Sequence, residues 1–145
     1  MFLYAGLSSF NHDLSSLVSG NNMFAYSKLV SFDSNFYKLT SADYMFAFCN
    51  NLTNFTVRDG INLGQNRVYN MFIGSTALKN WDCGLPYVTD INGVFDSAVN
   101  FETFTSDLSS LTVTPTIFKN KSSLTSFEAD LSSLETGNEM FFNST

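Results

Sequence analysis

Few side chains in this sequence could do chemistry, and they do not form a catalytic set. His12 is the one histidine, so a histidine-based triad or a multi-histidine metal site within one chain is excluded. We interpret His12, which precedes Asp13, as a solvated turn residue. The sequence has no glycine-rich phosphate loop, no G-x-S-x-G and no C-x-x-C. We therefore expect no enzyme and no cofactor.

Aspartates recur before the segment L-S-S, at Asp13, Asp107 and Asp130. Stacked carboxylates could indicate a calcium site, but Ca²⁺ takes about six to eight oxygen ligands, and the glycine-rich nonapeptide of calcium-binding β-rolls is missing. An aspartate followed by Leu-Ser-Ser is typical of a turn closed by the side-chain oxygen. We favour this structural interpretation and predict no metal site.

The two cysteines, Cys49 and Cys83, are separated by about one and a half repeats of the pattern described below. They therefore fall at different phases of the repeat, and we expect no disulfide. We predict that Cys49 is a buried, inert thiol and that Cys83 is partly exposed.

Composition narrows the class of partner. Charged residues make up 14% of the chain, against about 25% in an average protein, so Ser, Thr and Asn must build the polar surface. The net charge of −6 disfavours nucleic acid and anionic membranes as partners. No stretch approaches the roughly 20 apolar residues that span a bilayer, so we expect no membrane insertion.

The elements that must position these side chains are set by a repeating pair, usually Met-Phe. The pair returns at a nearly constant interval, longest in the third repeat, and such a period is the signature of a repeat array. The pairs are Met1-Phe2, Met23-Phe24, Met45-Phe46, Met71-Phe72, Val94-Phe95, Ile117-Phe118 and Met140-Phe141. They define a single solenoid of about six repeats and the start of a seventh, with boundaries 1–22, 23–44, 45–70, 71–93, 94–116 and 117–139.

Each repeat is expected to stack its apolar residues on the next. The second residue of the pair forms one column of phenylalanines, and the aromatic of an L-x-x-F motif forms another: Phe10, Phe32, Phe55, Trp81, Phe104 and Phe127. Offsets of three and four imitate an amphipathic helix, but the Ser, Thr, Asn, Gly and Pro content favours strands. We predict one short parallel strand around L-x-x-F in each turn of about 23 residues. We also expect little helix, with room for one-turn helical pieces near the Met-Phe pair.

The segment Met45–Phe55 reads M-F-x-x-C-x-x-L-T-x-F and resembles the leucine-rich repeats of the BspA-like bacterial surface protein family. The resemblance covers the whole chain and implies a right-handed leucine-rich solenoid with a ladder of short parallel strands. Family members occur in cell-surface adhesins, in gut bacteria and their phages, and in some protozoa. The resemblance therefore implies a surface or secreted bacterial protein, or a phage particle.

Both ends of the sequence fall at the Met-Phe phase. We expect the chain to be part of a longer array, with a genuine start at Met1 as the alternative. Without polar caps, both ends would expose apolar residues and unpaired strand edges. We therefore expect that the isolated chain associates end to end.

The remaining candidate site is the outer face of the strands. Side chains on either side of the buried aromatics should point outward, and the third and fourth repeats form an irregular patch with an insertion at residues 58–66. The candidate binding residues are Asp33, Thr56, Arg58, Asp82, Trp81, Thr105 and Glu128. We expect a non-enzymatic scaffold for adhesion or for binding a protein or glycan; the alternative is a structural spacer or fibre element with no ligand.

Overall fold

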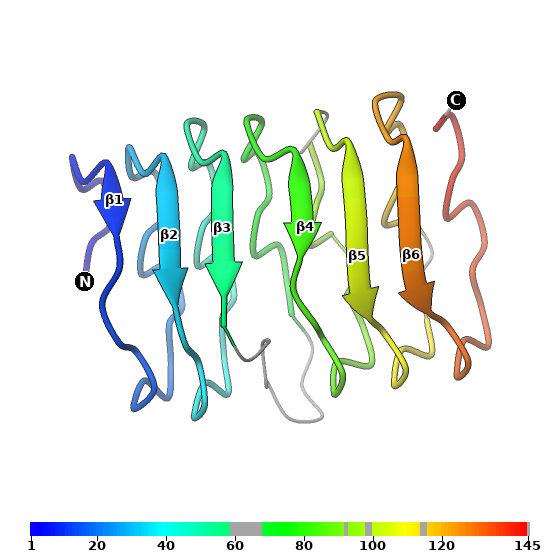
Figure 1. The fold of residues 1–145 in the computed structure, drawn as a ribbon, viewed down its shortest axis with the longest axis horizontal. Helices are drawn as coiled ribbons and strands as arrows, with labels where there is room; N and C mark the ends of the chain where they lie inside the picture. The colour runs from blue at the N-terminus through cyan, green and yellow to red at the C-terminus, as the bar shows by residue number, and fades with distance from the viewer. Residues whose placement is uncertain (59–67, 92, 98–99, 114–115, 145) are drawn as a thin grey trace.

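The computed structural model is a solenoid with one short strand in each turn (Figure 1). It describes residues 1–58, 68–91, 93–97, 100–113 and 116–144. The strands are β1 (Ser9–Phe10), β2 (Ser31–Ser34), β3 (Asn54–Val57), β4 (Asn80–Asp82), β5 (Thr103–Asp107) and β6 (Ser126–Asp130). They begin at nearly even intervals, the longest being that between β3 and β4. The predicted leucine-rich solenoid of short parallel strands is confirmed.

Each strand begins one residue before its inward aromatic residue. The aromatics pair in register along the ladder, with Phe10 beside Phe32 and Phe32 beside Phe55 in one sheet, and the column continues through Trp81, Phe104 and Phe127 in the other. Successive side chains of a strand alternate between faces, so the residues flanking each aromatic point away from the core. The columns read from the repeat are therefore the core of the molecule.

The ladder is divided into two three-stranded sheets, β1-β2-β3 and β4-β5-β6. The division falls where the repeat is longest, between β3 and β4. The core nevertheless runs across it, because the rings of Phe55 and Trp81 stack with centroids 5.4 Å apart and planes 13° apart. Residues 59–67, most of the predicted insertion, lie outside the described residues.

The phenylalanines of the Met-Phe pairs form a second stack behind the strands. Neighbouring rings of Phe2, Phe24, Phe46 and Phe72 are each 5.3 Å apart and within 7° of parallel. They meet the strand aromatics edge to face, as Phe46 meets Phe32 at 4.7 Å and 72°. Each such aromatic pair contributes about 0.5–1.5 kcal/mol beyond area burial, so stability accumulates from turn to turn.

The Met-Phe segments are tight turns, not the short helical pieces that the sequence allowed. The residue before the pair and the second residue after it both have positive φ, as at Asn22 (55°) and Tyr26 (57°) around Met23-Phe24. Two such reversals of hand, so close together, prevent a helix from starting. The described residues contain no helix, and among them nothing helical is long or apolar enough to cross a bilayer.

The turns are joined along the solenoid axis by their own backbone hydrogen bonds. Phe24 N donates to Met45 O at 2.9 Å, and Tyr26 N donates to Ala47 O at 2.8 Å. The same bonds continue across the gap between the sheets, where Phe46 N donates to Met71 O at 2.9 Å. We call this set of bonds the turn ladder; it links the repeats on the side away from the strands.

The aspartates before L-S-S close turns, as predicted. The carboxylates of Asp13, Asp107 and Asp130 accept hydrogen bonds from Ser15 N, Ser109 N and Ser132 N at 2.8, 2.9 and 2.9 Å. The hydrogen bonds from Ser109 lower the pKa of Asp107 below its ordinary value. The carboxylate lone pairs thus face their own turn.

Both cysteines are buried, and neither forms a disulfide. Cys49 is fully buried, as predicted, but the expected partial exposure of Cys83 is wrong, because only 3% of it is exposed. Cys83 follows Trp81 by two residues and takes the inward position that Val57 takes after Phe55. Trp81 Nε1 donates to Cys83 O at 2.7 Å, which holds this segment against the core.

Candidate functional site

The outward side chains of the strands form two polar rows. The first row precedes the inward aromatic of each strand, and its members are Ser31, Asn54, Asn80, Thr103 and Ser126. The second row follows the aromatic, and its members are Asp33, Thr56, Asp82, Thr105 and Glu128. Five of the seven predicted binding residues therefore lie in one row, because parallel in-register strands place equal repeat positions side by side.

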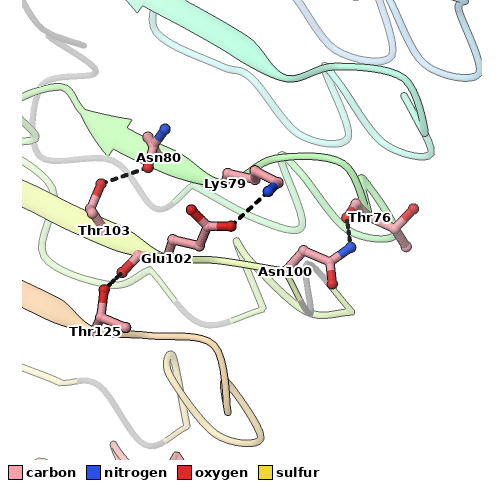
Figure 2. Close-up of polar contacts among 7 residues, drawn as sticks. All are labelled: Thr76, Lys79, Asn80, Asn100, Glu102, Thr103 and Thr125. Atoms are coloured by element: carbon pink, nitrogen blue, oxygen red, sulfur yellow. Dashed lines mark hydrogen bonds and ion pairs between the residues drawn. The ribbon is translucent and has the colours of Figure 1, made fainter.

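At the first row, the side chains on β4 and β5 are hydrogen bonded to each other, and residues beside them form further bonds. Figure 2 shows Thr103 Oγ1 donating to Asn80 Oδ1 at 2.8 Å and Lys79 Nζ bound to Glu102 Oε1 at 2.7 Å. In the same view, Thr125 Oγ1 donates to Glu102 O at 3.1 Å, and Asn100 Nδ2 donates to Thr76 O at 2.8 Å. Groups that are satisfied within the protein have little to gain from a ligand.

Among the described residues, the second row includes carboxylates without a partner. Within the part of the chain that the structure describes, the side chains of Thr56, Asp82, Thr105 and Glu128 make no hydrogen bond or ion pair, and all four residues are exposed. Asp82 and Glu128 flank Thr105 on neighbouring strands, so their backbones are about 10 Å apart. The row offers two carboxylates and a hydroxyl on a rigid sheet, all free to bind.

Asp33 and Arg58 lie at the other end of the site, on β2 and just after β3. Arg58 Nη2 contacts Asp33 Oδ2 at 2.8 Å, and both side chains are about half exposed (56% and 43%). An exposed pair of this kind stabilises a protein by about 0.2–1 kcal/mol at most. Its role is to hold the Asp33 carboxylate against the neighbouring turn.

Trp81 does not belong to the outer face, and that prediction is wrong. Its side chain is 1% exposed and lies between the rings of Phe55 and Phe104 at 5.4 and 6.4 Å. The strand period explains the placement, because Trp81 occupies the column of inward aromatics. The replacement of phenylalanine by tryptophan in this repeat therefore changes the core and not the outer face.

The side chains of the second row offer hydrogen-bonding groups. Carboxylates accept from hydroxyl, amide and ammonium groups, and a threonine hydroxyl both donates and accepts. Among the described residues, no group of three or more His, Cys, Asp and Glu side chains is arranged to hold a metal ion. The ring of His12 packs edge-on against Phe10 at 5.3 Å.

Two features of the structure were not predicted from the sequence. The Lys79–Glu102 pair could have been predicted, because the two positions are one repeat apart and so lie on neighbouring turns. The other is Lys121, which is only 3% exposed although it stands at the repeat position of Cys49. Its burial could have been predicted, because small residues hold the same position in the other repeats.

Comparison with known proteins supports the fold. No family model and no curated protein sequence matches this chain. Among solved structures, it is similar to a leucine-rich cell surface protein from Faecalibacterium prausnitzii A2-165, with a TM-score of 0.61 and 19% identity over 86% of this chain. The chain spans 32% of that protein's length. At this identity the likeness shows the fold alone, a leucine-rich repeat solenoid.

Proposed function

We propose that this chain is a non-enzymatic binding segment of a bacterial cell-surface or secreted protein, or of a phage particle, and that it captures a protein or glycan on its strand face. The observation that carries the proposal is the second row, where exposed polar side chains stand in register and, among the described residues, four of them have no partner. Sheet geometry fixes their spacing before binding, which reduces the ordering cost of association.

Two further observations support the surface location. The repeat resembles the BspA-like family, and the similar solved structure is described as a cell surface protein. A polar surface built from Ser, Thr and Asn, with 14% charged residues, agrees with this class.

The proposal is tested with a charge-neutral second row. The double variant Asp82→Asn, Glu128→Gln keeps the shape of both side chains and removes their charge. We expect it to lose at least about tenfold in affinity for any ligand that the unmodified chain captures on a glycan array or on immobilised mucin and matrix proteins. Two charge-assisted hydrogen bonds of about 1.5–3 kcal/mol each would be weakened.

The matched control is Asp13→Asn, Glu135→Gln, which makes the same charge change away from the second row. The substituted asparagine is expected to retain the turn that Asp13 closes, because its amide oxygen accepts the same bond from Ser15 N. Equal loss in both variants would mean that net charge, not the second row, governs capture.

The alternative function is a spacer that supplies length and rigidity, and the repeated bonds of the turn ladder favour it. A spacer would capture nothing on either panel, and its outward residues would be interchangeable. Exchange of the second-row residues between strands β4 and β6 then separates the two functions. Capture that is altered by the exchange supports binding at the second row, capture that is unaltered contradicts it, and the absence of any capture supports the spacer.

A further inference from the structure

A column of mostly small polar side chains runs through the interior beside the Met-Phe turns. Its described members are Ser27, Cys49, Ser75, Lys121 and Ser144. Most bond to the turn of the preceding repeat: Cys49 Sγ to Phe24 O at 3.1 Å and Ser75 Oγ to Phe46 O at 2.7 Å. Ser144 Oγ does the same to Phe118 O. The column therefore has a structural task that a short hydroxyl or thiol performs.

Lys121 departs from this pattern. It is 3% exposed, yet within the described residues no hydrogen bond or ion pair reaches its Nζ. Burial lowers the pKa of Lys121, and the charge of Asp96 opposes this effect in part. Lys121 Nζ is not one of the fully buried polar atoms without a partner, so the ammonium end reaches solvent while the stem is buried. The other repeats show that the fold does not require a cation here.

The side chain of Lys121 borders a cavity of about 500 Å³. This volume lies within the range of pockets that hold small ligands. The lining residues come from the turn segments and not from the strands: Ile73, Asp96, Ser97, Thr116, Lys119, Asn120 and Lys121. The cavity is thus a separate place from the second row.

The charges around the cavity single out Lys121. Lys119 Nζ is bound to Glu139 Oε2 at 2.8 Å and lies 5.1 Å from the centre of the Phe142 ring, so its charge already has partners. Lys121 is left as the cation available to an incoming anion. Asp96, on the other hand, would repel a ligand that carried negative charge all over its surface.

We propose that this cavity binds a small ligand with one carboxylate and several hydroxyl groups, of the size and chemistry of an acidic monosaccharide. Its carboxylate would meet Lys121 Nζ in a charge-assisted bond. Its hydroxyls would meet the carboxylate of Asp96, the amide of Asn120 and the hydroxyls of Ser97 and Thr116. Ile73 supplies an apolar contact for the C–H face of the ring.

Glucuronic acid is the probe, added to the uniformly ¹⁵N-labelled chain and followed by NMR. We expect saturable shifts confined to the amides of residues 96–97 and 119–121. Methyl glucoside, which lacks the carboxylate, should bind at least about tenfold more weakly, and so should inorganic phosphate. Shifts of equal size with phosphate would show that the cavity recognises charge alone and would overturn the proposal, as would the absence of saturation.

The variant Lys121→Met keeps the buried stem and removes the ammonium; Lys38→Met removes an exposed one and is the control. Binding should fall at least about tenfold in the first and remain unchanged in the second. If Lys121→Met does not fold, the Lys121 ε-methylene resonance of the unmodified chain decides. A bound carboxylate must raise the pKa of Lys121, and an unchanged pKa at saturation would overturn the proposal.

Discussion

Single residues set how closely neighbouring turns approach, and Gly74 is the clearest case. It occupies the left-handed turn position that follows each Met-Phe pair, with φ of +71°, and the ring of Phe48 lies over it. In the first repeats the same position holds Tyr4, Tyr26 and Phe48, whose rings stack at 4.9 and 4.8 Å. The stack of rings ends with Phe48, because the next position of the column is Gly74, which has no side chain.

We predict that Gly74→Ala destabilises the chain by about 1–3 kcal/mol, because strain at positive φ adds to a steric clash. A Cβ atom there would lie 2.5 Å from Phe48 Cδ1. Urea unfolding measures the loss. Gly6→Ala is the control, since a Cβ at Gly6 meets nothing within 4 Å, and its change should stay within about 0.5 kcal/mol. Equal effects would contradict the described packing.

A second residue-scale prediction concerns Cys49. Burial raises the pKa of its thiol above the ordinary value, so the folded state favours the neutral form. The resulting stability is complete below the pKa of the unfolded chain and is lost as the pH rises through the folded value. We expect the free energy of unfolding of the unmodified chain to fall, relative to Cys49→Ser, as the pH rises above the ordinary thiol pKa of about 8.5.

Serine suits this test because the same column holds Ser27 and Ser75, both buried. The difference between the two unfolding curves isolates Cys49 from other groups that titrate in the range. Parallel curves across the whole range would contradict the prediction.

At the scale of the elements, the junction of β3 and β4 depends on Trp81. The strand ladder is interrupted there, and ring stacking joins the two sheets through the core. We predict that Trp81→Ala costs about 3–5 kcal/mol, as expected for a large buried aromatic. Trp81→Phe should cost much less, because phenylalanine fills this column in the other strands. Chemical denaturation measures both.

The same variants test the placement of the site. Trp81→Phe should leave ligand capture on the strand face unchanged, because the side chain is not part of that surface. Weaker capture with unchanged stability would instead place Trp81 in the binding surface.

The strands were predictable because the L-x-x-F motif repeats at a period that only stacked turns satisfy. The turns were not, since the left-handed positions hold Tyr4, Tyr26 and Phe48, which are not typical turn residues; Gly74 and Asn120 are. The face on which the site lies was predictable, because successive side chains of a strand alternate between two faces. Which of its side chains already have partners was not predictable, because bonds such as Thr103 to Asn80 depend on rotamers and not on spacing.

At the scale of the whole molecule, every turn is buried by its neighbours, and the terminal turns have only one. Phe24, Phe46 and Phe72 are fully buried, whereas Phe141 is 43% exposed. Apolar residues of both outer turns are only partly buried: Phe2, Leu7, Leu14, Leu17, Leu124, Phe127, Leu131 and Leu134. Both ends of the solenoid therefore expose apolar surface.

We propose that the 145-residue chain associates end to end through these surfaces, because contact between two ends removes apolar area from water. Sedimentation velocity from about 10 μM to 1 mM should show growing species. Phe141→Lys should shift the mass distribution toward the monomer, whereas Tyr87→Lys, which adds the same charge to an exposed position in the middle of the chain, should not. A single monomeric boundary at the highest concentration would count against association.

The turn ladder has a mechanical consequence. Its hydrogen bonds lie along the solenoid axis, so a force that pulls the two ends apart opens them one turn at a time instead of shearing many at once. Each released turn would add roughly 80 Å of chain. Between β3 and β4, where the sheet is divided, the turn ladder and the bond from Val68 N to Asp90 O carry the tension, together with the stacked core. Because strand pairing is missing between the described residues of this junction, we expect the first step of a force–extension trace to come from the separation of the two sheets there.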